Sequence, residues 1–283
     1  MNRQPHEPEG LAEKERADYR RLAACVRAYG SMVVAFSGGV DSALLAYVAH
    51  RELGDRMQCA IGISNSFAQD EYNDAIVFLG QHEIPFREVG THELDNPAYR
   101  RNGPNRCYFC KDELFRRIAG KYRSEQFACV AYGANASDAT DHRPGARAAG
   151  EHGVAAPLAE CGLTKVRVRA LARALGLALW DKPAAPCLAS RIPYFTGVSR
   201  ERLARVERAE SSVRQLGFRD LRVRHYGDSA RVELPVRDHA RAADLWRDIE
   251  AAVRAAGFRR VVLEPDGLRS GRLNDALDGD RSD

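Results

Sequence analysis

Residues 33–42 read Val33-Val34-Ala35-Phe36-Ser37-Gly38-Gly39-Val40-Asp41-Ser42, and a second apolar segment continues from residue 43 to 49. An apolar run, a Gly-Gly pair and a second apolar run predict a buried strand, a tight turn and a helix. Adjacent glycines let the backbone bend sharply and approach a ligand closely. The serine hydroxyls and the unpaired N–H groups at the start of the helix therefore predict an anion-binding site.

The hexapeptide Ser37-Gly38-Gly39-Val40-Asp41-Ser42 resembles the pyrophosphate loop of ATP pyrophosphatases, which split ATP into AMP and pyrophosphate. It differs from the commoner phosphate loop because it lacks Gly-Lys-Ser/Thr at the required spacing. The structural alternative is an ordinary glycine-rich turn between a strand and a helix. The complete hexapeptide directly after an apolar strand favours the nucleotide-binding interpretation.

Composition limits the class of protein. The chain has 283 residues, of which 45% are hydrophobic, as in globular proteins. No apolar run approaches the roughly 20 residues that span a membrane, and residues 1–20 are too polar for a signal peptide. We therefore expect a cytoplasmic protein with no membrane partner. The net charge of +4 suits a small anionic substrate and does not require nucleic acid.

Strands alternate with helices through the first two thirds of the chain. Apolar runs at 57–63, 84–89 and 128–132 predict strands of a parallel sheet with right-handed crossovers. We expect an α/β ATP pyrophosphatase domain over residues 1–195. Ligands bind beyond the carboxyl ends of such strands. The polar residues that follow two of these strands should therefore converge on the Ser37 turn; they are Ser64, Gly133, Asn135 and Asp138.

The pattern changes near Gly197. Helices are predicted at 199–216 and 238–256, and strands at 219–226, 230–236 and 258–264. This order predicts a smaller C-terminal α+β domain over residues 196–283. Apolar and charged residues alternate in both of the first two strands, which predicts one polar, exposed face for solvent, a ligand or another subunit. We expect the chain to form a homo-oligomer.

The seven cysteines are an odd number, which argues against a disulfide framework. Cys25, Cys59 and Cys129 lie in apolar segments and are predicted to fill the core. Cys107 and Cys110 form a C-x-x-C pair, which fits zinc, an iron–sulfur cluster or a redox pair. Cys187 lies in a proline-rich loop at 180–193, where regular structure is not expected. Three thiolates can hold a cubane cluster and leave one iron open; unrelated thiols are the alternative.

The chain resembles the LarE family of ATP-dependent sulfur transferases, which build the nickel-pincer cofactor of lactate racemase. The resemblance extends from about residue 20 to about 272. It rests on the Ser37–Ser42 loop, on Asn105-Arg106-Cys107-Tyr108-Phe109-Cys110-Lys111, and on residues 133–145, 180–193 and 267–271. The Lys-Pro-Ala-x-x-Cys-Leu-Ala-Ser-Arg block is its most specific part.

The resemblance implies a substrate and a reaction. ATP and Mg²⁺ would adenylate a carboxylate of pyridinium-3,5-dicarboxylate mononucleotide, and sulfur would displace AMP to give a thiocarboxylate. The cycle would repeat on the second carboxylate. In one version of the family a lone cysteine gives up its own sulfur, and in the other three cysteines hold a 4Fe–4S cluster that carries a labile sulfide. Because all three thiols are present, the cluster version is favoured.

Residue roles follow from the resemblance and from side-chain chemistry. Gly38 and Gly39, with Ser37 and Ser42, would hold pyrophosphate. The remaining predicted site residues are Asp41 and Asp138 for Mg²⁺, Lys111 for phosphate charge, Cys107, Cys110 and Cys187 for the cluster, Cys187 as sulfur donor, and Arg191, Arg222 and Arg224 for the substrate phosphate. Glu233 would bind a metal or pair with an arginine. Each arginine carries little information, because only five of the 43 basic residues are lysines.

Three other functions are compatible with the loop. A tRNA thiolase would share the adenylation step but should carry an RNA-binding module and a stronger basic excess. An amidotransferase-type ligase would deliver ammonia to an adenylate and would not need ordered cysteines. A nucleotide-binding regulator would release no pyrophosphate.

Overall fold

The computed structural model describes residues 7–122, 125, 127–140 and 144–269. The chain divides into two compact units. Unit 1 comprises residues 1–64, 71–93 and 107–185, and unit 2 comprises residues 65–70, 94–106 and 186–283. Within the described ranges, no helix is both long enough and apolar enough to cross a membrane.

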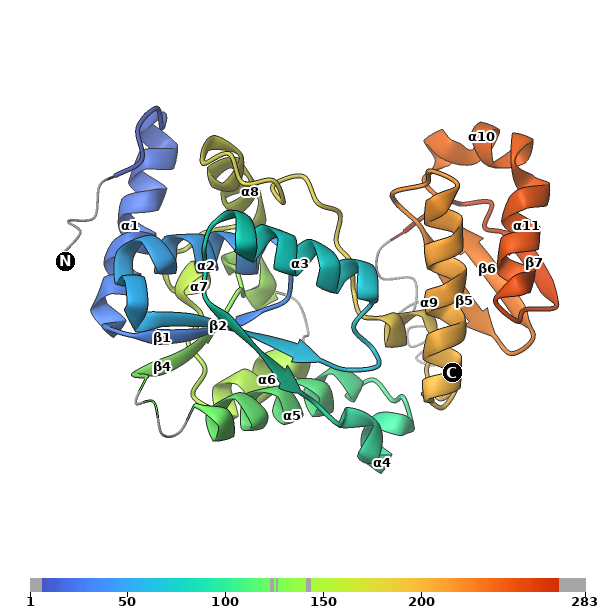
Figure 1. Cartoon of the computed structure of the whole chain (residues 1–283), viewed down its shortest axis with the longest axis horizontal. Helices are drawn as coiled ribbons and strands as arrows, with labels where there is room; N and C mark the ends of the chain where they lie inside the picture. The colour runs from blue at the N-terminus through green and yellow to red at the C-terminus, as the bar shows by residue number, and fades with distance from the viewer. Residues whose placement is uncertain (1–6, 123–124, 126, 141–143, 270–283) are drawn as a thin grey trace. The chain divides into compact units, whose positions relative to one another are not determined.

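Unit 1 is built on a four-stranded parallel sheet in the order β3-β2-β1-β4 (Figure 1). The strands are β1 (Met32–Phe36), β2 (Met57–Ile63), β3 (Phe86–Gly90) and β4 (Cys129–Tyr132). The register pairs Val34 of β1 with Cys59 of β2 and with Ala131 of β4. All five residues of β1 are buried, because neighbouring strands and helices cover the centre of the sheet on both sides. The prediction of a parallel α/β sheet is confirmed.

Helices cover both faces of this sheet (Figure 1). Those of unit 1 are α1 (Glu13–Tyr29), α2 (Val40–Leu53), α3 (Gln69–Gln81), α5 (Arg106–Lys121), α6 (Pro144–Glu151), α7 (Pro157–Glu160) and α8 (Lys165–Ala174), with α3 and α5 each beginning in unit 2. Helices α1, α2, α7 and α8 pack against one another. On the other face Phe115 and Ile118 of α5 and Ala149 of α6 pack on Val33 and Ala60. Helix α2 ends at Leu53, with Gly54 as its C-cap.

Unit 2 contains a three-stranded sheet in the order β5-β6-β7. The strands are β5 (Arg222–Tyr226), β6 (Ser229–Glu233) and β7 (Arg260–Leu263), and the longer helices are α9 (Arg200–Gln215), α10 (His239–Asp244) and α11 (Trp246–Ala255). A short helix, α4 (Pro97–Arg100), belongs to its 94–106 segment. Strands β5 and β6 are antiparallel, whereas β6 and β7 are parallel.

Two predictions for the C-terminal part are wrong. The helix expected at 238–256 is divided into α10 and α11, because Leu245 between them has φ −98° and ψ 13°. The polar sheet face expected to be exposed is largely buried, with Arg222, Arg224 and Glu233 only 7%, 2% and 0% exposed. The predicted domain boundary at 195/196 stays a prediction about independent folding. The boundary between the two compact units lies at 185/186. Residues 65–70 and 94–106 also belong to the unit that contains the C-terminal part.

Candidate functional site

The turn between β1 and α2 is closed by its two serines. The Oγ atom of Ser42 accepts a hydrogen bond from the Ser37 N–H at 3.2 Å and donates to the Gly39 carbonyl at 3.0 Å. The two hydroxyls lie 3.2 Å apart. Gly38 has φ +73°, which side chains with a Cβ rarely adopt. The turn therefore needs glycine at 38, and Gly39 is the N-cap that starts α2.

The segment after β4 approaches this turn closely. A Cβ atom on Gly133 would lie 2.6 Å from the Ser42 nitrogen and 2.9 Å from the Asp41 carbonyl carbon. Two residues further on, the Asn135 side-chain amide donates to Asp41 Oδ1 at 3.2 Å. The carboxyl ends of β1 and β4 thus bring together two segments predicted from separate parts of the sequence. The expected convergence of Gly133 and Asn135 on the Ser37 turn is observed.

Lys165 completes the environment of Asp41. Its ammonium group forms an ion pair with Asp41 Oδ2. Its backbone N–H donates to Ser137 Oγ at 3.1 Å, which holds the start of α8 against the segment after β4. The Lys165 side chain is 38% exposed and that of Asp41 is 19% exposed. The ammonium group therefore lies beside the turn with access to solvent.

The other residues predicted for unit 1 have these positions. Asp138 accepts the backbone N–H of Asn135 at 3.0 Å through Oδ2, and Ser64 directly follows β2 at the same edge of the sheet as the turn. Lys111 lies on α5, with its ammonium group 5.8 Å from the Phe115 ring centroid. Residues 141–143 and 270–271, which contribute to the family resemblance, lie outside the described residues.

Cys107 and Cys110 lie in the first turn of α5. Residues three apart on a helix share a face, and Cys107 is exposed whereas Cys110 is half-buried. Cys59 is a buried core thiol as predicted, and burial raises its pKa. Cys129 is half-buried and is not the core residue that was expected, although burial raises its pKa to about 11. Among the described residues no group of three His, Cys, Asp or Glu side chains is gathered as a metal site. The metal roles of these cysteines and of Asp41 stay predictions.

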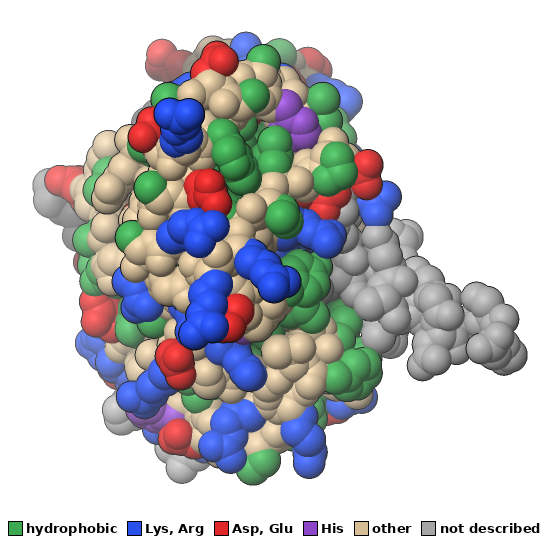
Figure 2. Space-filling model, turned by 90° about the vertical axis from the view of Figure 1, so that its right-hand side faces the viewer, with side chains coloured by type: hydrophobic (Ala, Val, Ile, Leu, Met, Phe, Trp, Pro, Cys, Tyr) green, Lys and Arg blue, Asp and Glu red, His purple; other side chains and the backbone are tan. Residues whose placement is uncertain are grey.

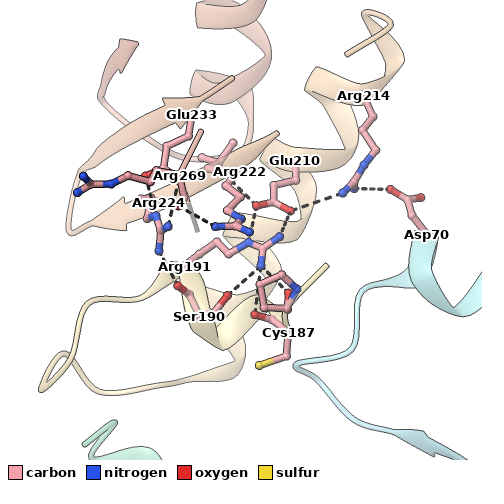
Figure 3. Close-up of polar contacts among 12 residues, drawn as sticks. Asp70, Cys187, Ser190, Arg191, Glu210, Arg214, Arg222, Arg224, Glu233 and Arg269 are labelled. Atoms are coloured by element: carbon pink, nitrogen blue, oxygen red, sulfur yellow. Dashed lines mark hydrogen bonds and ion pairs between the residues drawn. The ribbon is translucent and has the colours of Figure 1, made fainter. Parts of the chain in front are cut away.

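Cys187 belongs to unit 2, directly before the short helix η4 (Leu188–Arg191). The N–H of Leu188 donates to the Ser66 carbonyl at 2.9 Å. The Arg191 guanidinium donates to the carbonyls of Pro186 and Cys187 and to Ser190 Oγ (Figure 3). The backbone around Cys187 is therefore held in place although the proline-rich sequence forbids a long regular element.

Arg191 is itself fixed by a carboxylate. Its Nε and one terminal nitrogen donate to the two oxygens of Glu210 on α9 at 2.8 and 3.1 Å. Glu210 Oε1 also accepts the Val223 N–H of β5 at 2.9 Å. Both side chains of this pair are almost fully buried, at 4% and 1% exposure. One bidentate pair therefore links η4, α9 and β5.

Arg224 has an equivalent partner. It donates to both oxygens of Glu233 at 2.9 and 3.1 Å and to the Ser190 carbonyl at 2.9 Å (Figure 3). The prediction that Glu233 pairs with an arginine is confirmed. Because Arg224 and Glu233 on this sheet face are paired with each other, their charges can be buried, which is why this part of the face is not exposed as expected.

Arg222 differs from its two neighbours. It donates to the Arg269 carbonyl at 3.2 Å. Among the described contacts, its guanidinium group forms no bidentate ion pair with a carboxylate. Burial, together with the charges of Arg191 and Arg224, lowers the pKa of Arg222. Among the described ion pairs, Arg191 and Arg224 each hold a carboxylate, whereas Arg222 lies close enough to both arginines for their charges to act on it.

Sequence reasoning missed Lys165, Glu210 and Lys182 as contributors. Lys182 forms ion pairs with Glu71 at 2.9 Å and Asp74 at 2.8 Å on α3. Because lysine is scarce in this chain, the positions of Lys165 and Lys182 near the predicted motifs could have indicated that they belong to the site. Glu210 carried none, because it is one of many acidic residues on a charged helix.

Comparisons with known proteins agree with this geometry. Residues 20–122 match the NAD synthase family model. The chain is 40% identical to an uncharacterized Synechocystis protein, over 87% of this chain and 92% of the relative. It is 34% identical to the pyridinium-3,5-bisthiocarboxylic acid mononucleotide synthase of Lactiplantibacillus plantarum, over 90% of this chain and 93% of the relative. An uncharacterized Methanocaldococcus jannaschii protein is 25% identical over 84% of this chain and 91% of its own length.

The turn after β1, the parallel sheet and the full-length similarity agree with one another. The chain belongs to the LarE family of the ATP pyrophosphatase superfamily and is an ATP-dependent enzyme.

Proposed function

We propose that this enzyme converts the two carboxylates of pyridinium-3,5-dicarboxylate mononucleotide into thiocarboxylates, with ATP split into AMP and pyrophosphate. The observation that carries the proposal is the Asp41–Asn135–Lys165 arrangement beside the glycine turn, in a chain similar over its full length to a synthase of the bisthiocarboxylic product. The product would serve the nickel-pincer cofactor of lactate racemase.

Unit 1 would perform the activation step. A substrate carboxylate oxygen attacks the α-phosphorus of ATP, and the bond to the bridging oxygen breaks to release pyrophosphate. The backbone N–H groups at Gly38 and Gly39 and the start of α2 would bind the departing anion. Lys165 would leave Asp41 to neutralise phosphate charge, with Lys111 as a second candidate.

Mg²⁺ fits the chemistry of Asp41. Each carboxylate oxygen of Asp41 accepts one contact in the structure. Because a carboxylate has about four lone-pair sites, Asp41 can also bind a cation. Mg²⁺ is commonly held by one or two carboxylates and by substrate phosphates. Asp41, with Asp138 as a second candidate, would hold the ion, which would neutralise charge on the phosphates.

The sulfur would come from cysteines of both units, and substrate recognition from unit 2. Cys107, Cys110 and Cys187 would hold a 4Fe–4S cluster, and the paired thiols in one helical turn of α5 fit the ligand spacing of such clusters. The cluster would supply sulfide to the acyl-adenylate; in the alternative version Cys187 gives up its own sulfur. Arg222 would bind the substrate phosphate, because Arg191 and Arg224 already hold buried carboxylates.

The decisive experiment is anaerobic turnover with ATP, Mg²⁺ and the dicarboxylate mononucleotide, followed by mass spectrometry of product and protein. We expect AMP, pyrophosphate and a product in which oxygen is replaced by sulfur. Cys187→Ala should still release pyrophosphate but form no thiocarboxylate. Cys129→Ala, a cysteine outside the proposed site, should behave like the unchanged protein. Pyrophosphate release without any sulfur-containing product in the unchanged protein would contradict the proposal.

The two sulfur sources and the amide-forming alternative give different results in the same assay. Cluster-based transfer predicts iron and sulfide in the purified protein and loss of product in Cys107→Ala. Sacrificial transfer predicts that Cys187 loses the mass of one sulfur. An amide product in the presence of ammonia would instead support a ligase, which the NAD synthase family match over residues 20–122 keeps as the second candidate.

We propose no nucleic-acid partner. The molecular face in Figure 2 carries Lys and Arg side chains with Asp and Glu side chains among them. The net charge of +4 is mild, whereas nucleic-acid-binding domains are commonly strongly basic. Retention of transfer RNA by the purified protein would contradict this part of the proposal.

A further inference from the structure

Two thiols that the proposed reaction does not use face each other in unit 1. Cys25 lies on α1, and Cys161 directly follows α7. The two thiols lie close enough to influence each other's pKa, and both are half-buried. Helices α1 and α7 pack against each other, so the two cysteines meet although 135 residues separate them.

Each thiol also has a second contact that fixes its position. Cys25 Sγ donates to the Glu160 carboxylate at 3.5 Å, and Cys161 Sγ donates to the Arg21 carbonyl at 3.6 Å. Arg21 lies one helical turn before Cys25, so the two contacts place Cys161 against the turn that carries Cys25. The expectation that Cys25 fills the core is wrong, because the thiol is part-exposed and makes polar contacts.

We propose that Cys25 and Cys161 form an intramolecular disulfide when the protein meets a small-molecule disulfide such as oxidised glutathione. The Cys161 thiolate attacks one sulfur of glutathione disulfide, and one glutathione thiolate leaves. The Cys25 thiolate then attacks the Cys161 sulfur of the mixed disulfide and displaces the second glutathione. Two protein thiols are oxidised to one disulfide, and glutathione disulfide is reduced to two glutathione thiols, which take up the two protons that the protein thiols lose.

The charges around the pair set its pH dependence. Burial, Cys161 and Glu160 raise the pKa of Cys25 to about 12. Burial also raises the pKa of Cys161, as does the charge of Glu160, although Cys25 and the charge of Arg21 act in the opposite direction. The other titratable groups nearby are Tyr29, which donates to Glu160 at 2.7 Å, and Cys129. Because the thiolate is the attacking species, the bond should form faster at pH 9 than at pH 7, by about tenfold or more.

The bond would connect two separated parts of unit 1. Helix α7 packs on η3 (Ala136–Thr140), which follows Asn135. A bridge from α1 to the end of α7 therefore anchors the helical turn that abuts this segment. Closing so long a loop restricts the unfolded chain strongly. We expect the thermal midpoint of the oxidised protein to lie about 5 °C or more above that of the reduced protein.

The test uses the full chain treated with oxidised glutathione, quenched with N-ethylmaleimide and digested with trypsin. Cleavage after Arg21, Arg27, Arg147 and Lys165 leaves Cys25 in peptide 22–27 and Cys161 in peptide 148–165. We expect these peptides to be linked in the unchanged protein and in Cys129→Ser. They should not be linked in Cys25→Ser or Cys161→Ser, and neither variant should show the rise in thermal midpoint.

Recovery of both peptides as separate maleimide or glutathione adducts would overturn the proposal, as would a link through the peptide that contains Cys129. If a serine variant fails to fold, peptide mapping of the unchanged protein still decides. This outcome is independent of the thiocarboxylate assay, because neither thiol takes part in the proposed reaction.

Discussion

Asp41 and Lys165 lie 124 positions apart in the sequence and form an ion pair beside the glycine turn. Asp41 also accepts from Asn135, so its carboxylate is oriented from two sides. An ammonium group held so close to the glycine turn could move from the aspartate to an anion bound at the turn over a short path. Its charge would then act on the phosphates during activation.

Lys165→Met should therefore lower kcat/KM for ATP-dependent pyrophosphate release by about 100-fold, since removal of one charge-stabilising group typically costs this much. Lys14→Met, an exposed lysine on α1, is the matched control and should leave the rate unchanged. The measurement is pyrophosphate release with the mononucleotide substrate. A rate within twofold of the unchanged protein would show that Lys165 does not act on ATP.

His225 gives unit 2 a pH-dependent stability. It is 2% exposed, and burial together with Arg202 and Arg205 lowers its pKa below the usual 6.5. Below pH 6.5 the unfolded chain binds a proton that the folded chain does not, so stability is present above this pH and is lost as the pH falls. Urea unfolding at about pH 8 and about pH 5.5 should show this loss. His225→Asn should reduce it, and an unchanged pH dependence in the variant would contradict the assignment.

At the scale of elements, the site depends on how closely the segment after β4 approaches the start of α2. A side chain at position 133 would collide with backbone atoms of Asp41 and Ser42. These atoms cannot move aside as a flexible side chain can. Helix α9 has the corresponding role in unit 2, where Glu210 joins it to η4 and β5.

Gly133→Ala should disrupt ATP binding and lower the free energy of unfolding by about 1–3 kcal/mol through overpacking. Gly150→Ala is the matched control, because a Cβ atom there meets nothing within 4 Å and alanine favours the helix α6. Calorimetric ATP titration and urea unfolding measure the two effects. Wild-type ATP affinity in Gly133→Ala would show that the turn can shift without loss of the site.

At the scale of the whole molecule, unit 2 is assembled from segments far apart in the sequence. The Asn102 side chain donates to the carbonyls of Ile192 and Pro193 at 3.2 and 2.7 Å, and Arg106 donates to the Ala189 carbonyl at 2.8 Å. Segments 65–70 and 94–106 therefore hold the chain that follows Cys187.

A protease recognition sequence inserted between the exposed residues Ala184 and Ala185 should permit a clean cut. The two fragments should stay together in gel filtration and separate only in denaturant, because unit 2 draws on both. The uncut protein serves as the reference for the elution volume. Separation under native conditions would show that the segments of unit 2 do not hold together.

Much of the fold was predictable because its signals are local. The apolar runs gave the strands of the parallel sheet, and the glycine turn after β1 indicated the nucleotide site. The division of α10 from α11 was not predictable, since no glycine or proline marks it. The burial of the polar sheet face was also missed, because alternation shows which residues share a face but not what covers them.

The sequence by itself determined the parallel α/β sheet, the turn at Ser37–Ser42 and the family, because each depends on patterns within contiguous stretches of residues. Only the tertiary structure decided that Lys165 meets Asp41, that Glu210 and Glu233 hold Arg191 and Arg224, and that Cys25 faces Cys161. The physical reason is that the partner of a charged group or a thiol is decided by which side chains lie near it in the folded protein. Side-chain periodicity fixes the direction in which a group points, whereas packing of distant segments fixes what it meets.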